Sequence, residues 1–171
     1  EAGDIYDGVR FTRTVVMVHE DLVVFLDRVE ADRERTFDIA LHLPGRWTDT
    51  PAGTPWEDVD TPGYMHIRDA SAATVDGTTL RAEVGDVATF IAIAANASTT
   101  VITGTGVGDH LEDRVPIAIL RRAGRSTEYA WAVALRGGPP EIAWDADVLS
   151  VTEGTASRRL RLRDDGHVTA E

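Results

Sequence analysis

The stretch "RTFDIALHLPGRW", residues 35–47, alternates apolar and polar side chains with the period of two that is typical of a β-strand. Its apolar face is formed by Phe37, Ile39, Leu41 and Leu43. The opposite face carries Asp38 and ends on His42, immediately before a Pro-Gly turn. The stretch therefore predicts a half-buried strand whose solvated face ends on a histidine.

The same alternation continues along the chain in short segments separated by turn signals. These segments are residues 9–18, 22–30, 64–70, 78–84, 88–95, 99–103, 116–123, 127–135, 141–144, 148–152, 158–163 and 167–170. No segment has the pattern of an amphipathic helix. About a dozen strands without crossover helices predict an all-β fold, an antiparallel β-sandwich formed as a single domain by residues 1–171. The charged segment 31–34 is predicted to be a turn, and residues 104–114 a glycine-rich loop.

The composition excludes several classes of partner. The formal net charge is -12, and all 17 basic residues are arginines. A chain this acidic repels nucleic acids and anionic membranes, so we expect neither as a partner. A high-GC genome and a high-salt cytoplasm would each explain the lack of lysine, and the sequence leaves the cellular location open. The chain has no cysteine and begins at Glu1 without a visible signal peptide, so we expect a mature product or an excised domain.

His42 is the first candidate for a functional residue. An imidazole on the solvated face of a strand can bind a sugar hydroxyl, transfer a proton or hold a metal ion. The alternative is a solvated histidine that pairs with Asp38 on the same face. The spacing alone leaves both interpretations open.

The long segment 44–63 holds four prolines and two tryptophans, Trp47 and Trp56, and is predicted to be a surface loop. Exposed aromatic rings of this kind stack on the faces of sugars. The alternative is that the two rings close the open end of the sandwich.

The segment "SRRLRLR", residues 157–163, predicts a strand with Leu160 and Leu162 inward and a row of arginines (Arg159, Arg161 and Arg163) outward. Such a row suits the carboxylates or sulfates of a polyanionic chain. The alternative is an edge strand whose charges prevent aggregation and pair with Asp164 and Asp165.

Other chemistry is not indicated. Three histidines, His19, His66 and His110, lie in or beside turns, and none has the spacing of a closed metal site, so no metal is expected. The segment "GTGVGDH" lacks the strand–turn–helix context of a phosphate-binding loop. No nucleophile elbow and no buried pair of carboxylates can be recognised.

The order of the motifs resembles one family. "Y-x-G-V-x-x-T-R" from Tyr6 to Arg13 is followed by "LVVFLDRVE" and then by "F-D-I-A-L-H-L-P-G". Later come a glycine-rich segment, "P-I-A-I-L-R-R-A-G" and "T-E-Y-A-W-A-V-A-L". Over residues 4–136 this order is similar to the C-terminal β-sandwich region of heparinase II/III-like polysaccharide lyases, a family that includes oligoalginate lyases.

The resemblance implies a β-sandwich that supports a lyase and forms one wall of a cleft for a uronic-acid polysaccharide, which the full-length enzyme cleaves by β-elimination. Candidate substrate-binding residues of that wall are His42, Arg13, Trp47 and Trp56. The upstream α/α toroid and the family's histidine-rich metal segments are absent, so this chain alone is not expected to be active, and the catalytic residues remain unknown. The implied partners are an acidic polysaccharide and an upstream domain of the same chain; no cofactor is expected here, although a structural zinc occurs in some full-length members. The alternative function is a stand-alone carbohydrate-binding or structural module.

Overall fold

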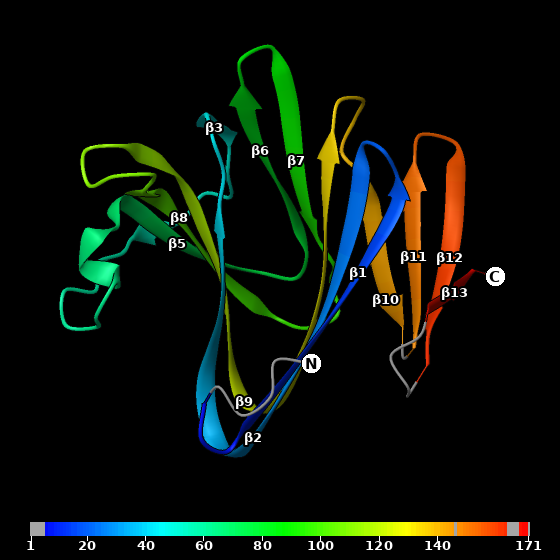
Figure 1. Ribbon diagram of the computed structural model, residues 1–171, viewed down its shortest axis with the longest axis horizontal. Helices are drawn as coiled ribbons and strands as arrows, with labels where there is room; N and C mark the ends of the chain where they lie inside the picture. The colour runs from blue at the N-terminus through cyan, green and yellow to red at the C-terminus, as the bar shows by residue number, and fades with distance from the viewer. Residues whose placement is uncertain (1–5, 146, 164–167, 171) are drawn as a thin grey trace.

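The computed structural model describes residues 6–145, 147–163 and 168–170, and it confirms the predicted all-β fold (Figure 1). The strands of a large sheet are β1 (Val9–His19), β2 (Leu22–His42), β3 (Arg46–Asp49), β4 (Thr54–Pro55), β5 (Arg68–Val75), β6 (Thr78–Val84), β7 (Val87–Ile93), β8 (Thr99–Val107) and β9 (Arg114–Leu135). A small sheet contains β10 (Glu141–Asp145), β11 (Val148–Glu153), β12 (Ala156–Leu162) and β13 (Val168–Ala170). The 3-10 helix η1 (Tyr64–His66) precedes β5. Within the described ranges, no helix is long and apolar enough to cross a membrane.

Two long strands, β2 and β9, form the centre of the large sheet. They pair antiparallel from Leu22 opposite Ala134 to His42 opposite Ile117. The first part of β2 also pairs with β1, and the last part of β9 pairs with β7. The first part of β9 instead pairs with β8. Both long strands bend at the bottom of Figure 1, so the sheet folds back on itself as two layers.

The predicted turn at residues 31–34 is wrong, because β2 runs through it. The predicted segments 22–30 and 35–43 belong to one strand, which ends at His42 and has an irregular register between Glu30 and Arg35. The exposed charged side chains of 32–34 interrupt the alternation at the bend, but the backbone remains paired, and Asp32 donates its N–H to the carbonyl of Gly8. In the same way, the predicted strands 116–123 and 127–135 are the two arms of β9.

The inner core lies between the two layers. It contains the apolar face predicted for residues 35–43, because Phe37 and Ile39 are buried and Leu41 and Leu43 pack against them. Aromatic residues of the last part of β9, Tyr129 and Trp131, complete this core.

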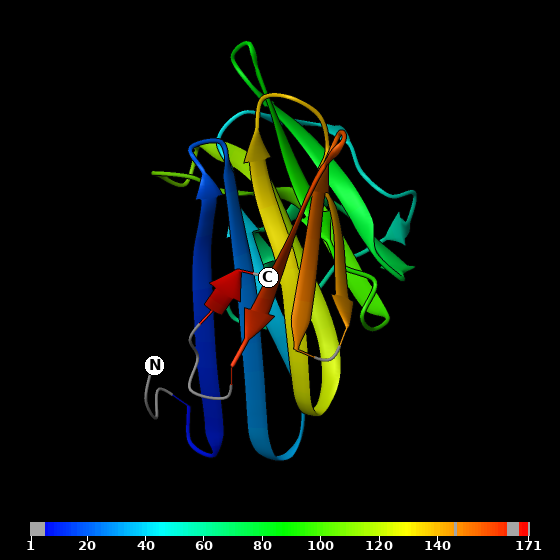
Figure 2. The same cartoon turned by 90° about the vertical axis from the view of Figure 1, so that its right-hand side faces the viewer.

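The small sheet covers the other side of one layer (Figure 2). Its buried side chains Leu149, Val151 and Leu160 belong to one cluster with the alanines at 130, 132 and 134 of β9. Alanine leaves room for a second sheet to approach closely, so this layer of the sandwich is covered on both faces. Leu160 and Leu162 face inward, as their alternation predicts.

Two loop predictions and one strand prediction need correction. The segment 44–63 contains β3 and β4, which pair with β6 and β5 at the ends of the sheet. The predicted strand 64–70 begins as η1 and becomes extended only at Arg68. The glycine-rich segment 104–114 begins inside β8, which continues to Val107. The local sequence pattern does not reveal these strands. They form through pairing with strands that lie far away in the sequence.

Candidate functional site

The outward side of the second arm of β2 carries the strongest candidate from the sequence. We call this surface the His42 face: it comprises Asp38 and His42 of β2, Arg121 of β9, and the side chains of Trp56 and Tyr64. In the register, Asp38 lies opposite Arg121 and His42 lies opposite Ile117. The segment that carries Trp56 and Tyr64 packs on Ile102, Ile117 and Ile119.

Asp38 is the polar centre of the His42 face. It accepts two hydrogen bonds from Arg121, from Nε at 2.9 Å and from Nη2 at 2.8 Å. The hydroxyl of Tyr64 donates to the same carboxylate. The carboxylate of Asp38 is therefore engaged by a bidentate, charge-assisted pair. Asp38 does not pair with His42, because His42 lies four residues, or about 13 Å, along the strand.

The aromatic rings add to the same cluster. Trp56 and Tyr64 meet edge to face, with ring centroids 5.9 Å apart. The guanidinium of Arg121 lies 5.7 Å from the centroid of Trp56 and 5.5 Å from that of Tyr64. Together these contacts hold the segment around η1 against the sheet.

Tyr64 is held in its protonated form. Burial is the largest cause that raises the pKa of its phenol, and the hydrogen bond to Asp38 raises the pKa further. The adjacent Arg121 opposes this effect only in part. At neutral pH Tyr64 is therefore a hydrogen-bond donor and not a base.

His42 is exposed at the far end of this surface. A Cβ placed on Gly106 of β8 would lie 3.2 Å from Nε2 of His42 and 3.3 Å from Cβ of Ile117. Glycine at position 106 therefore leaves the space that the imidazole occupies. Over the part of the chain that the structure describes, the His42 side chain makes no hydrogen bond, so the ring is available to a ligand.

Arg13 does not lie on the His42 face. It projects from β1 toward Asp27 of β2 and forms an ion pair with it, with Nε to Oδ1 at 2.5 Å and Nη2 to Oδ2 at 2.8 Å. The Asp27 side chain is fully buried and also accepts the indole N–H of Trp131 at 2.9 Å. The alternation of the sequence could not show that Arg13 and His42 are separated, because the bend of β2 places residues 27 and 42 in different layers.

The two tryptophans have different surroundings. Trp47 donates its indole N–H to the carbonyl of Gly104 at 3.0 Å and packs against the inner core. Trp47 therefore lies against the inner core and not on the His42 face. Trp56 lies on the His42 face, so of the four candidate residues only Trp56 and His42 share a surface.

The sequence reasoning missed Asp38, Arg121 and Tyr64 as a cluster. The available signal was the acidic side chain of Asp38 on the same face of the predicted strand as His42, but its partner Arg121 becomes visible only when β2 and β9 are paired. His19, in turn, contacts Glu153 of β11, with Nε2 and Oε2 2.7 Å apart. Over the described ranges, no three or more His, Asp or Glu side chains come together as ligands for a metal ion.

Comparison with known proteins adds a finding about the fold. No protein-family model matches the chain, and no curated protein sequence matches it. A solved structure of a heparan sulfate lyase HepC mutant from Pedobacter heparinus is similar, with a TM-score of 0.62 and 11% sequence identity. The similarity covers 98% of this chain and 24% of that chain, so this chain spans about a quarter of the lyase's length. The two proteins share a fold.

Proposed function

We propose that this chain is a β domain of a polysaccharide-lyase-related protein and that its His42 face forms one wall of a cleft for a uronic-acid polysaccharide. The observation that carries the proposal is the extent of the fold similarity. It covers 98% of the chain and therefore includes the small sheet as well as the large one. The similar protein is a heparan sulfate lyase, and heparan sulfate is an acidic polysaccharide.

The chemistry would be β-elimination. A base removes the proton alpha to the uronate carboxylate, the bond between the ring carbon and the leaving glycosidic oxygen breaks, and a carbon–carbon double bond forms. The leaving oxygen takes up a proton from a general acid. Both proton-transfer groups would come from outside this chain, since three quarters of the length of the similar lyase has no counterpart here.

The residues of the His42 face fit a binding role in this scheme. The exposed imidazole of His42 can bond to a sugar hydroxyl or a carboxylate. The ring of Trp56, partly buried and held by Arg121 and Tyr64, offers a stiff apolar edge for sugar C–H groups. The guanidinium of Arg121 is already engaged by Asp38, so its role is to position the two rings.

The test uses the full-length protein that contains this chain. Heparan sulfate, hyaluronan and alginate are each added, and the ultraviolet absorbance of the unsaturated uronate product is followed. We expect a rise with at least one substrate and slower turnover in His42→Ala, with the matched control His66→Ala unchanged. If no substrate gives a rise, the lyase proposal is wrong. If the protein binds these polysaccharides without cleaving them, the stand-alone carbohydrate-binding alternative replaces it.

A further inference from the structure

The strand β1 forms one margin of the large sheet (Figure 2). Among the residues that the structure describes, it pairs with β2 alone, so one of its two backbone edges has no strand beside it. An edge strand presents a row of N–H and C=O groups with which a strand of another molecule can pair. β1 has eleven residues, and none of them is a proline, so this row is long and continuous.

The other margins of the two sheets are shorter. β3 has four residues, and β4 has two, the second of which is Pro55. The second arm of β2 pairs only with β9, as far as the structure describes it, and carries the charged residues Arg35 and Asp38. In the small sheet, β10 has five residues and β13 has three. Short length, proline and charge are devices that prevent edge-to-edge pairing, so β1 is the margin best suited to a further strand.

The odd-numbered side chains of β1 form an apolar surface at this margin. Phe11 packs against the inner core, whereas Val15 is 55% exposed and Met17 is 72% exposed. In the register, Val15 lies opposite Phe25 and Met17 lies opposite Val23, so the exposed side chains continue the apolar surface of β2. A strand added beside β1 would cover part of this surface.

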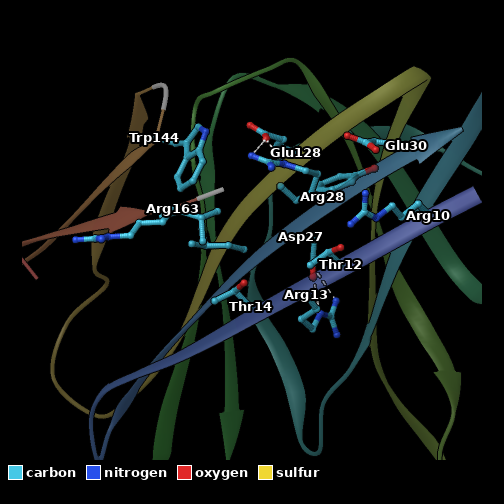
Figure 3. A pocket seen from close by; sticks show the side chains of 13 residues that line it. Arg10, Thr12, Arg13, Thr14, Asp27, Arg28, Glu30, Glu128, Trp144 and Arg163 are labelled. Carbon is cyan, nitrogen blue, oxygen red and sulfur yellow. Dashed lines mark hydrogen bonds and ion pairs between the residues drawn. The ribbon is translucent and has the colours of Figure 1, made fainter. Parts of the chain in front are cut away.

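The charges on β1 are matched by acidic residues on β2. β1 itself has no acidic residue, although the chain has a formal net charge of -12. Arg13 forms its ion pair with Asp27, and Arg10 lies opposite Glu30. Figure 3 shows these four side chains beside a pocket of about 380 Å³, which Trp144 borders where the small sheet ends. A second acidic molecule that approaches the edge of β1 therefore meets no carboxylate of the strand itself.

A second copy of the chain offers a strand that matches β1 in length and pattern. Two copies related by a two-fold axis would pair antiparallel, and the register that uses the whole strand places the axis at Thr14. Phe11 then lies opposite Met17 of the second copy, and Arg13 lies opposite Val15. Both arginines of the strand face valines, so this register brings no like charges together and joins the two apolar surfaces.

We propose that two copies of this chain associate through β1, which pairs antiparallel about Thr14 and joins the two large sheets into one. The strand is about 35 Å long and a sheet is about 10 Å thick, so the contact covers about 350 Å² of each copy. A stable interface buries about 800 Å² on each side. The dimer is consequently weak and forms at high protein concentration. It does not involve the His42 face, so it holds or fails independently of the proposed function.

The register can be tested with a single cysteine, because the chain has none of its own. In Thr14→Cys the two thiols face each other across the axis, at the separation that a disulfide requires. In the matched control Thr12→Cys the two thiols lie four residues, or about 13 Å, apart along the paired strands. After mild oxidation, non-reducing electrophoresis should show a covalent dimer for Thr14→Cys alone. No dimer of Thr14→Cys, or equal dimer formation by both variants, would overturn the proposal.

The dimer of the wild-type chain is measured by sedimentation at increasing protein concentration. The dimer fraction should rise between about 0.01 M and about 1 M salt, because the Debye length falls from about 30 Å to about 3 Å and screens the repulsion between two acidic copies. His42→Ala should dimerise as the wild type does. A dimer fraction that falls with salt would overturn the proposal. A wild-type chain that stays monomeric would do the same and leave the edge of β1 to a strand of another protein.

A substitution at the apolar surface tests what holds the two copies together. Met17→Lys should raise the dimer dissociation constant about tenfold, because it places a charge against Phe11 in each half of the contact. The matched control is Leu111→Lys, at a side chain that is also 72% exposed but lies away from β1, and it should not weaken the dimer. Thermal denaturation checks that both variants are folded. Equal weakening by the two lysines, or none by Met17→Lys, would contradict pairing through β1.

Discussion

Arg121 and Arg122 are neighbours in the sequence but have different environments. Arg121 projects outward and forms its bidentate pair with Asp38 beside Tyr64 and Trp56. Arg122 projects inward, is only 6% exposed and lies 4.6 Å from the ring centroid of Tyr129. One arginine fixes a surface segment to the sheet, and the other fills part of the interior.

The partners of the two arginines differ in charge. Within the described part of the chain, every hydrogen-bond acceptor of Arg122 is uncharged: the Thr99 hydroxyl, the Asn96 side-chain carbonyl and the backbone carbonyls of Ala97 and Glu128. Burial consequently lowers the pKa of Arg122, whereas the Asp38 carboxylate raises the pKa of Arg121. The comparison teaches that several oriented dipoles and an aromatic face can replace a counterion in the interior.

The largest effect is expected from Arg122→Ala. The substitution removes four hydrogen bonds and leaves the acceptors of Asn96 and Thr99 facing a cavity, so the free energy of unfolding should fall by about 3 kcal/mol or more. Urea denaturation measures this change. The control Arg46→Ala, whose side chain is 77% exposed, should stay within about 0.5 kcal/mol of the wild type. Equal losses in the two variants would contradict an interior role for Arg122.

A smaller effect is expected from Asp38→Asn. This change weakens the hydrogen bonds from Arg121 and Tyr64 on a partly exposed surface, and we expect a loss of about 1–2 kcal/mol. Hydrogen exchange should become faster at Ile67, whose N–H bonds to the carbonyl of Tyr64, while the β2–β9 ladder stays protected. Asp49→Asn on β3 is the matched control. Unchanged exchange at Ile67 would show that the cluster does not hold η1 in place.

The dependence of stability on alkaline pH tests the environments of the two arginines, because Tyr64 lies beside Arg121 and Tyr129 lies beside Arg122. Burial is the main cause that raises the pKa of both Tyr129 and Tyr64. An unfolded chain releases phenol protons near about pH 10, before the folded chain does, so stability should fall as the pH rises above that value. Denaturation at a series of pH values should show a flatter decline in Tyr129→Phe, and to a lesser degree in Tyr64→Phe. A steeper decline in either variant would contradict the direction of these shifts.

The smallest effect on stability is expected from His42→Ala. The side chain is exposed, so the free energy of unfolding should change by less than about 0.5 kcal/mol, as for the control His66→Ala. Thermal denaturation and polysaccharide binding are measured on the same samples. Loss of binding without loss of stability would assign His42 to the ligand, and unchanged binding would remove it from the proposed wall.

Much of the fold could be predicted because it depends on local periodicity. The alternation correctly placed Phe37 and Ile39 inside and Asp38 and His42 outside. The candidate site was less predictable, since Arg13 and His42 are both polar residues of predicted strands but lie in different layers. The pocket beside Trp144 could not be foreseen at all, because it exists only where one sheet extends beyond another.

The sequence by itself determined that consecutive residues such as Arg121 and Arg122 lie on opposite faces, because side chains alternate along any extended chain. It also determined the all-β class through the apolar positions of each segment. For two charged neighbours such as these arginines, only the tertiary structure decided which side chain lies in the interior. That choice depends on where β2 and β9 bend and on which layer the small sheet covers, and both follow from contacts between residues far apart in the chain.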